Sequence, residues 1–380
     1  MALKYTEEQQ EFISMVHEFG ETELKANIRA WDEKGACPAE AFDKAFEMGL
    51  HMLEVPEEYG GIGLSFETTA MIFEELAKYD AGYAITLVST FVALRSVILS
   101  GNKDLAQYFA DIIAPGKFAA FSLSETNAGT DAGAVAATAK KVGNEYILNG
   151  EKTFVTNGNL ASVYVAVFRT SADGNRGLSA FLVERSRDGI TVGKHEDKMG
   201  LRLSDTSTVN FADVHIPAEN IIGKEGDGFK MALNSLNLSR AFVATLAVGI
   251  MQRALDESVK YAKLREQFGR PIYKFQAVQE MLADMATQTE ASRLMVNNTM
   301  KMMDGGNLVR KEGAMTKTFV SDLAQQVTSN AVQIFGGYGV SKEYPVEKLL
   351  RDVKVFQIFE GTNQIQRTTI ANELIKEYTN

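Results

Sequence analysis

The chain has 380 residues, of which 45% are hydrophobic, 23% charged and 9% aromatic, a composition that predicts two or three folded domains and excludes a disordered chain or a small disulfide-stabilised module. Lysine and arginine total 39 against 49 aspartates and glutamates, giving a formal net charge of −10, which disfavours nucleic acid as a partner. The single cysteine, Cys37, excludes an internal disulfide and cysteine-based metal clusters and is typical of a reducing compartment.

Residues 1–117 are predicted to form an N-terminal α-helical domain. The opening residues carry no apolar signal core, so we expect a cytoplasmic protein. Apolar residues recur at helical spacing after Thr6, which is placed as an N-cap, with Gln9 near the third helical position. The predicted helices of this domain span residues 6–31, 38–48, 65–79, 81–100 and 103–110.

The segment 81–101 is a candidate membrane-spanning helix because it is apolar apart from Arg95 and a few hydroxyl side chains. Its length matches the roughly 20 residues of a membrane-spanning helix. A lone arginine at bilayer depth is costly, and no basic flank orients the segment. We therefore expect a helix buried in the protein core and no membrane span.

The remaining chain divides into a middle β domain and a C-terminal helical domain. Strand-forming residues dominate at 162–168, 178–183 and 208–214, which predicts a β-barrel or sandwich over residues 118–222. Helical spacing returns over residues 223–380, which predicts a four-helix bundle. The expected fold class is therefore α+β. The helices expected in the last domain span residues 229–265, 276–303, 311–335 and 363–378.

Common catalytic motifs are absent from the sequence. There is no GxGxxG after a strand, no phosphate-binding GxxxxGK[ST], and no HExxH, GxSxG or CxxC. The four histidines show no metal-ligand spacing, so no metal site is expected.

Two segments near the start of the β domain are candidates for ligand binding. The segment 121–131 combines hydroxyl groups with Gly129 in a loop that can turn backbone N–H groups toward an anion or a polar ring edge, although an ordinary turn has the same composition. The segment 149–158 places Phe154 and Thr156 on the same face of a strand, which suits a planar heterocycle. Core packing explains Phe154 equally well.

Two further segments lie in the C-terminal domain. The glycine-rich run 333–339 allows close approach of a phosphate or ribose, and it also suits a simple helix end. In the segment 356–367, Thr362 is expected to cap the final helix. Glu360 follows an apolar run, so in a desolvated cleft its pKa would rise toward that of a useful base. The alternative for Glu360 is a solvated loop carboxylate.

Taken together and in this order, the four segments resemble the flavin-dependent acyl-CoA dehydrogenases, in particular their short-chain, butyryl-type members. The resemblance covers essentially the whole chain and extends to residues 197–206, 218–229, 264–270 and 343–352. It implies that Glu360 removes the α-proton of an acyl-CoA thioester while FAD N5 accepts the β-hydride. The thioester oxygen would be stabilised by the Glu360 N–H and a flavin ribityl hydroxyl.

The resemblance also implies the cofactor, the partners and the site residues. FAD is the expected cofactor, an electron-transfer flavoprotein the expected electron acceptor, and a homotetramer built as a dimer of dimers the expected assembly. The FAD contacts implied within one subunit are Phe121, Leu123, Ser124, Gly129, Thr130, Phe154, Val155, Thr156, Thr362, Asn363 and Gln364. The contacts implied from a neighbouring subunit are Arg265, Gln267, Phe268, Gln276, Gln333, Ile334, Phe335, Gly336 and Gly337. The substrate contacts implied are Thr130, Asn237, Leu238, Ser239, Arg240 and Gly361, together with Arg95.

Some positions leave alternatives open. Arg95 lies in the apolar helix that, by resemblance, borders the acyl pocket, where it would select a polar or carboxylated acyl tail. Alternatively it pairs with an acid such as Asp104 or reaches a subunit surface. Arg240 contacts the CoA moiety or serves as a structural ion-pair partner.

Three alternative functions remain at this stage. The same site run in reverse would make the chain an enoyl-CoA reductase fed by a reduced flavoprotein. A non-redox lyase of the superfamily would be expected to lack Glu360, and a flavin-free scaffold would be expected to lack the four segments.

Overall fold

The computed structural model describes residues 5–379. The prediction that the opening residues carry no signal peptide falls partly on positions 1–4, which lie outside the described residues. The first helix, α1 (Glu7–Phe19), begins at the predicted N-cap, where Thr6 and Gln9 form a reciprocal capping box. The helix expected over residues 6–31 is wrong in one respect, because it is interrupted. A π-helical turn (Gly20–Leu24) packs the glycine against the ring of Tyr79, and α2 (Ile28–Lys34) follows.

The rest of the N-terminal domain is helical, as predicted. Its longer helices begin at side-chain caps: Ser65 caps α4, Asp80 caps α5 and Asn102 caps α6. In chain order the remaining elements are a 3₁₀ turn (Ala39–Phe42), α3 (Asp43–Glu47), a 3₁₀ turn (Glu57–Tyr59), α4 (Phe66–Tyr79), α5 (Ala81–Leu99) and α6 (Lys103–Ile113).

The middle domain is one eight-stranded sheet in the order β6-β7-β3-β2-β4-β5-β8, with β1 pairing parallel to β4. Aromatic residues from β3, β4, β5 and β7 pack into a single cluster, so the sheet curves around a core of its own. The strands are β1 (Phe118–Ser122), β2 (Thr138–Val142), β3 (Glu145–Thr156), β4 (Ala161–Arg169), β5 (Leu178–Glu184), β6 (Ile190–His195), β7 (Thr206–Pro217) and β8 (Ile221–Ile222).

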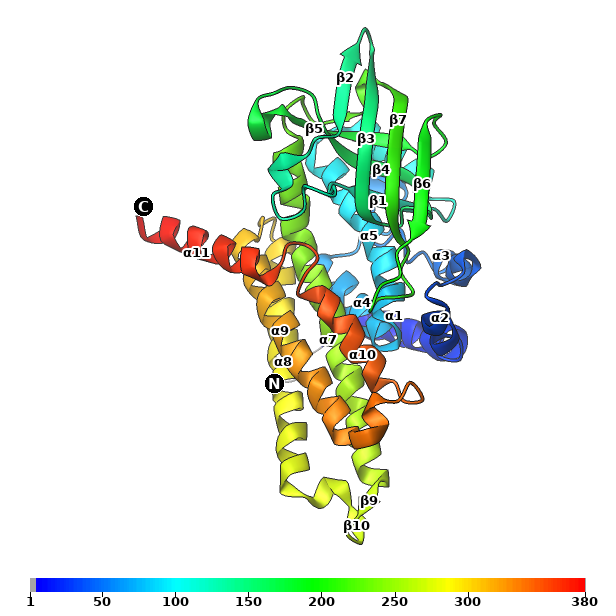
Figure 1. Cartoon of the computed structure of the whole chain (residues 1–380), viewed down its shortest axis with the longest axis vertical. Coiled ribbons are helices and arrows are strands. Elements are labelled where there is room, and N and C mark those ends of the chain that lie inside the picture. Colours follow the sequence, from blue (N-terminus) through cyan, green and yellow to red (C-terminus); the bar gives the residue numbers. More distant parts are fainter. Residues whose placement is uncertain (1–4, 380) are drawn as a thin grey trace.

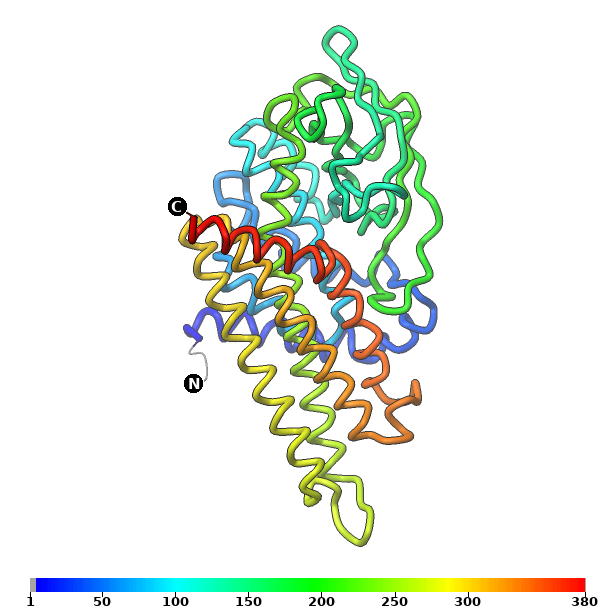
Figure 2. The backbone as a smooth tube through the Cα atoms, turned by 60° about the vertical axis from the view of Figure 1, so that its left-hand side comes forward, coloured from blue at the N-terminus to red at the C-terminus, as the bar shows by residue number. Residues whose placement is uncertain are grey.

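The C-terminal domain is helical, and its three longest helices run side by side (Figures 1 and 2). A small hairpin, β9 and β10, lies at the end of the bundle opposite the sheet domain (Figure 1). The final helix projects sideways from the bundle (Figure 1). The elements are α7 (Gly228–Leu264), β9 (Glu266–Gln267), β10 (Arg270–Pro271), α8 (Gln276–Asp304), α9 (Arg310–Phe335), a 3₁₀ turn (Gly336–Val340), α10 (Val346–Phe356) and α11 (Asn363–Thr379).

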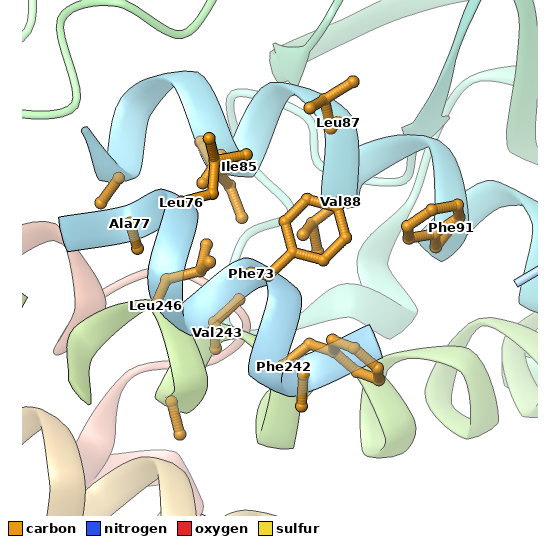
Figure 3. Packing of buried hydrophobic residues seen from close by; sticks show 14 of the residues in the cluster. Phe73, Leu76, Ala77, Ile85, Leu87, Val88, Phe91, Phe242, Val243 and Leu246 are labelled. Atoms are coloured by element: carbon orange, nitrogen blue, oxygen red, sulfur yellow. The ribbon is translucent and has the colours of Figure 1, made fainter. Parts of the chain in front are cut away.

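One continuous hydrophobic core joins the N-terminal and C-terminal domains. Phe73 of α4, Val88 and Phe91 of α5, and Phe242 and Leu246 of α7 pack together in it (Figure 3). Truncating a buried phenylalanine such as Phe91 to alanine costs about 3–5 kcal/mol. This packing fixes the direction of α5 and α7, the two helices that carry side chains toward the cleft described below.

Two helices, α5 and α7, are long and apolar enough to cross a membrane by composition alone. In the structure 89% of the most apolar window of α5 and 83% of that of α7 are buried. Their apolar residues are thus accounted for by packing within the protein.

Candidate active site

A cleft of about 510 Å³ lies where the sheet domain meets α5 and the segment between α10 and α11. Three of the four segments singled out in the sequence meet in it, although almost 200 positions separate the two segments 121–131 and 149–158 from the segment 356–367. The predicted residues that line the cleft are Phe121, Leu123, Ser124, Gly129, Thr130, Phe154, Thr156, Glu360, Gly361 and Thr362.

Phe154 is exposed, not packed in a core. Its side chain is 70% exposed, and its φ of 52° places it in the left-handed region that a phenylalanine rarely adopts. The pairing of β3 with β7 shifts register between Lys152 and Val155, so the regular alternation expected for this strand is broken at Phe154. The core-packing alternative for Phe154 is therefore wrong, and its ring is presented beside Thr156 in the cleft.

Glu360 also has left-handed backbone, with a φ of 57°. Its carbonyl oxygen accepts hydrogen bonds from Arg240 Nε at 3.2 Å and Gln366 Nε2 at 3.1 Å. The next carbonyl, that of Gly361, accepts from Lys317 Nζ at 2.8 Å. Three buried side chains thus hold the loop in a conformation that costs on the order of 1–3 kcal/mol per residue.

The carboxylate of Glu360 is desolvated, and its buried oxygen lacks a hydrogen-bond partner within the described part of the chain. Its Oε2 atom is buried and has no hydrogen-bond partner among residues 5–379. Burial raises the pKa of Glu360 to about 7, while the positive charges of Arg240, Arg95 and Lys317 act in the opposite direction. The alternative of a solvated loop carboxylate is therefore wrong. The group can exchange a proton near neutral pH.

A buried lysine organises the first segment. Lys152 Nζ lies 2.7 Å from Glu125 Oε1 and 3.3 Å from the carbonyl oxygen of Leu123, and its side chain is fully buried. Glu125 in turn accepts from the N–H groups of Ala136 and Ala137. This network fixes the loop 121–131, which carries Ser124, Gly129 and Thr130 into the cleft.

Arg95 does not pair with Asp104, and it does not reach a surface. It is 3% exposed, and its guanidinium contacts both oxygens of Glu54, with Nε to Oε2 at 2.8 Å and Nη2 to Oε1 at 2.5 Å. The remaining Nη1 donates to Ser239 Oγ at 3.1 Å. The alternative of an ion pair with an acid is therefore correct in kind, but the acid is Glu54, 41 residues earlier in the chain, and not Asp104.

A second cavity of about 670 Å³ is lined by residues at and beside the β9–β10 hairpin. That hairpin lies at the far end of the bundle from the sheet domain (Figure 1). It brings the glycine-rich segment 333–339 together with residues after α7. Arg265 lies over the ring of Tyr338 at 5.6 Å, and Phe268 nearby is 94% exposed with a φ of 52°. The predicted residues that line this cavity are Arg265, Gln267, Ile334, Phe335, Gly336 and Gly337.

Other predicted residues line neither cavity. Val155 belongs to the core of the sheet domain, and Ser239 donates to the carbonyl oxygen of Ser235 besides accepting from Arg95. Arg240 contacts Asn237 Oδ1 at 2.5 Å as well as the Glu360 carbonyl oxygen, so it holds the loop. The remaining residues of this group are Leu238, Gln276, Gln333, Asn363 and Gln364, together with Phe268 beside the second cavity.

Several site residues were missed in the sequence. Lys317 and Gln366 support the Glu360 loop, and Lys198 and Met199 line the cleft. The one available indication for Lys317 was its place among the small residues Gly313, Ala314, Ser321 and Ala324, which a buried helix face would contain. Gln366 lies in the segment 356–367, and Lys198 and Met199 lie in the segment 197–206, both of which carried the family resemblance, but no role was assigned to these three residues.

Comparisons with known proteins agree with this geometry. Three family models match the chain: the acyl-CoA dehydrogenase N-terminal domain at residues 6–117, the middle domain at 120–214 and the C-terminal domain at 226–375. The short-chain specific acyl-CoA dehydrogenase of Megasphaera elsdenii is 40% identical over 386 aligned positions, covering 99% of this chain and 100% of the relative. The CarC subunit of the caffeyl-CoA reductase-Etf complex of Acetobacterium woodii is 39% identical, covering 98% of this chain and 100% of the relative.

A solved structure described as the electron transferring flavoprotein of Acidaminococcus fermentans superposes with a TM-score of 0.95 at 43% identity, covering 98% of this chain and 99% of the other. The chain therefore belongs to the acyl-CoA dehydrogenase family, whose members are FAD-dependent oxidoreductases acting on CH–CH bonds. The predicted fold class is confirmed. The similarity to the short-chain dehydrogenase slightly exceeds that to the reductase subunit, so the comparisons do not favour the reductase alternative.

Proposed function

We propose that this chain oxidises a short-chain acyl-CoA thioester to the 2-enoyl-CoA, with Glu360 as the catalytic base. The observation that carries the proposal is the buried, unpartnered Oε2 atom of Glu360 in a cleft, together with a pKa raised to about 7. A buried carboxylate with no partner is costly, and such groups persist where chemistry needs them.

The residues of the loop divide the chemical task between them. Glu360 Oε2 takes the α-proton of the thioester. The N–H of Glu360, which has no acceptor among residues 5–379, donates to the thioester oxygen as negative charge develops there. Arg240, Gln366 and Lys317 keep both groups in place by holding the carbonyl oxygens of the loop.

The cleft also suits FAD. Phe154 offers an exposed aromatic ring, the hydroxyls of Ser124, Thr130 and Thr156 offer polar partners, and the Cα of Gly129 faces open space. When bound, FAD supplies the acceptor for the β-hydride. We assign FAD contact to the residues that line the cleft.

The position of the second cavity supports an assembly in which a neighbouring copy completes the FAD site. Arg265 there can bond a diphosphate with its planar fork, and Gly336 and Gly337 leave open space for close approach. The cavity is lined by residues at and beside the β9–β10 hairpin and the cleft by residues of the sheet domain, so one chain alone does not bring the two together. The hairpin and the sheet domain lie at opposite ends of the molecule (Figure 1). A homotetramer fits this arrangement.

An electron-transfer flavoprotein is the proposed electron acceptor, supported by the Etf-complex subunit and the flavoprotein structure among the relatives. The lone cysteine, which has no second cysteine for an internal disulfide, supports a cytoplasmic location.

Anaerobic titration tests the proposal. The purified protein, loaded with FAD, is mixed with butyryl-CoA while the flavin absorbance at about 450 nm is followed. Bleaching by the saturated thioester is expected. If no saturated thioester bleaches the flavin while an enoyl-CoA reoxidises the chemically reduced protein, the proposed direction is overturned.

A further inference from the structure

Three buried residues from separate parts of the chain form a polar bridge behind the cleft. Arg95 of α5 holds Glu54 with two hydrogen bonds and Ser239 of α7 with a third. We propose that this Glu54–Arg95–Ser239 bridge closes the acyl end of the cleft and restricts the substrate to short, uncharged acyl chains. The inference rests on the proposed function.

The bridge lies one helical turn beyond the cleft on both helices. On α5 the cleft is lined by Ile85, Ser89 and Val92, and Arg95 is the next residue on that face. On α7 the cleft is lined by Leu236, and Ser239 follows it by three residues. Because Arg95 and Ser239 are bonded at 3.1 Å, the space between the two helices ends there.

A second contact joins the helices one turn before the bridge, at the level of the last cleft-lining residues. Ser235 Oγ on α7 donates to the carbonyl oxygen of Val92 on α5 at 2.7 Å. The guanidinium of Arg95 also lies 4.1 Å from the centroid of the Phe242 ring, one turn further along α7 from Ser239. The Phe242 ring, the Arg95–Glu54 ion pair and the two serine hydroxyls therefore fill the space between α5 and α7 beyond the cleft. A longer acyl chain finds no apolar path there.

The charge of Arg95 is fully used within the protein. The side chains of Arg95 and Glu54 are each only 4% exposed, and the two carboxylate oxygens face the guanidinium fork. A dicarboxylic acyl tail would have to displace Glu54 from this pair and leave a buried carboxylate without a partner, which is strongly unfavourable. The bridge therefore rejects charged tails and acts as a wall.

The first test uses the unmodified holoenzyme and needs no variant. We expect kcat/KM to fall at least about tenfold from butyryl-CoA to octanoyl-CoA, and glutaryl-CoA to be no better than octanoyl-CoA. Equal rates with butyryl-CoA and octanoyl-CoA, or a preference for glutaryl-CoA, would overturn the inference.

The second test removes the wall without leaving an unpaired charge. The double variant Glu54→Ala/Arg95→Ala should raise the octanoyl-CoA to butyryl-CoA ratio of kcat/KM about tenfold or more, because it opens volume at the acyl end. The double variant Glu54→Gln/Arg95→Met keeps most of the volume and should keep the short-chain preference. A matched control is Glu74→Ala/Arg293→Ala, which removes another buried ion pair, between α4 and α8, and should leave the ratio unchanged.

The outcomes separate the two proposals. If butyryl-CoA reduces the flavin but opening the bridge leaves the ratio unchanged, the inference is overturned and the proposed function stands. If no saturated acyl-CoA of any length reduces the flavin of the unmodified enzyme, the proposed function is overturned and the inference falls with it.

Discussion

The Nζ atom of Lys317 lies 2.8 Å from the carbonyl oxygen of Gly361, the residue that directly follows Glu360 in the chain. The same ammonium group donates to Asn363 Oδ1, also at 2.8 Å, so a single buried lysine ties α9 to the loop and to the start of α11. Burial lowers the pKa of Lys317 to about 7, although the negative charge of Glu360 opposes this shift. Lys317 is therefore a positioning residue of the proposed catalytic loop.

Replacing Lys317 with methionine is expected to lower kcat by about 10- to 100-fold, because Asn363 Oδ1 loses its donor, the Gly361 carbonyl oxygen keeps only the longer bond from Gln366, and the loop relaxes. Removal of the positive charge should also raise the pKa of Glu360, which the pH profile of kcat/KM reports. Lys317→Arg keeps the charge and should move that pKa less. Lys311→Met on the same helix, where the lysine pairs with Glu377 near the surface, is the control and should alter neither quantity.

The pH dependence of the reaction follows from the raised pKa of Glu360. The base must be ionised, so kcat/KM for butyryl-CoA is expected to rise with pH through about 7 and to level off above it. A carboxylate at its ordinary pKa would be ionised throughout this range and would give a flat profile. A flat profile between pH 6 and 8 would show that Glu360 is solvated in the free enzyme.

The same shift makes a prediction about stability. Since the pKa of Glu360 is higher in the folded state than in the unfolded chain, the folded state binds the proton more tightly, and stability falls as pH rises from about 4.5 to about 7. Glu360→Gln removes this penalty. The variant should exceed the parent protein in free energy of unfolding by on the order of 1–3 kcal/mol at pH 8 and by much less at pH 5. Denaturant titration at both pH values measures the difference.

The Glu125–Lys152 pair is expected to control retention of FAD. Lys152→Met leaves the Glu125 carboxylate without its cation and loosens the loop 121–131, at a cost of about 3–5 kcal/mol in stability. The ratio of FAD to protein after gel filtration should fall. The double variant Glu125→Gln/Lys152→Met should recover part of the stability, and an FAD ratio unchanged by Lys152→Met would show that the loop does not need the pair.

Much of the fold follows from local sequence patterns. The predicted helix over residues 276–303 differs from α8 by one residue at its C-terminal end, and that over 229–265 is displaced by one residue from α7, because periodicity and end signals are local. The break after α1 was not predictable in this way, because it depends on Gly20 meeting Tyr79, 59 positions away. Long-range packing decides such breaks.

For the site, too, local sequence features were predictable and features set by long-range contacts were not. The segments around Phe154 and Glu360 stand out in the sequence, but their left-handed backbone does not, since neither residue is a glycine. The partner of Arg95 was also out of reach, because any of several acids could have met it until the fold placed Glu54 there. The family resemblance therefore points to the residues of the site, but only the fold distinguishes those that line the cleft from those that support its loops.

The most direct test of the account is rapid anaerobic mixing of butyryl-CoA with the FAD-loaded protein and with its Glu360→Gln variant. We expect butyryl-CoA to bleach the flavin of the parent protein. In the variant the bleaching rate should be about 10²- to 10⁴-fold lower, with FAD content unchanged. Glu219→Gln, an exposed glutamate on the sheet domain, should bleach at the parent rate. Near-normal bleaching by Glu360→Gln with FAD retained would contradict the assignment of Glu360 as the base.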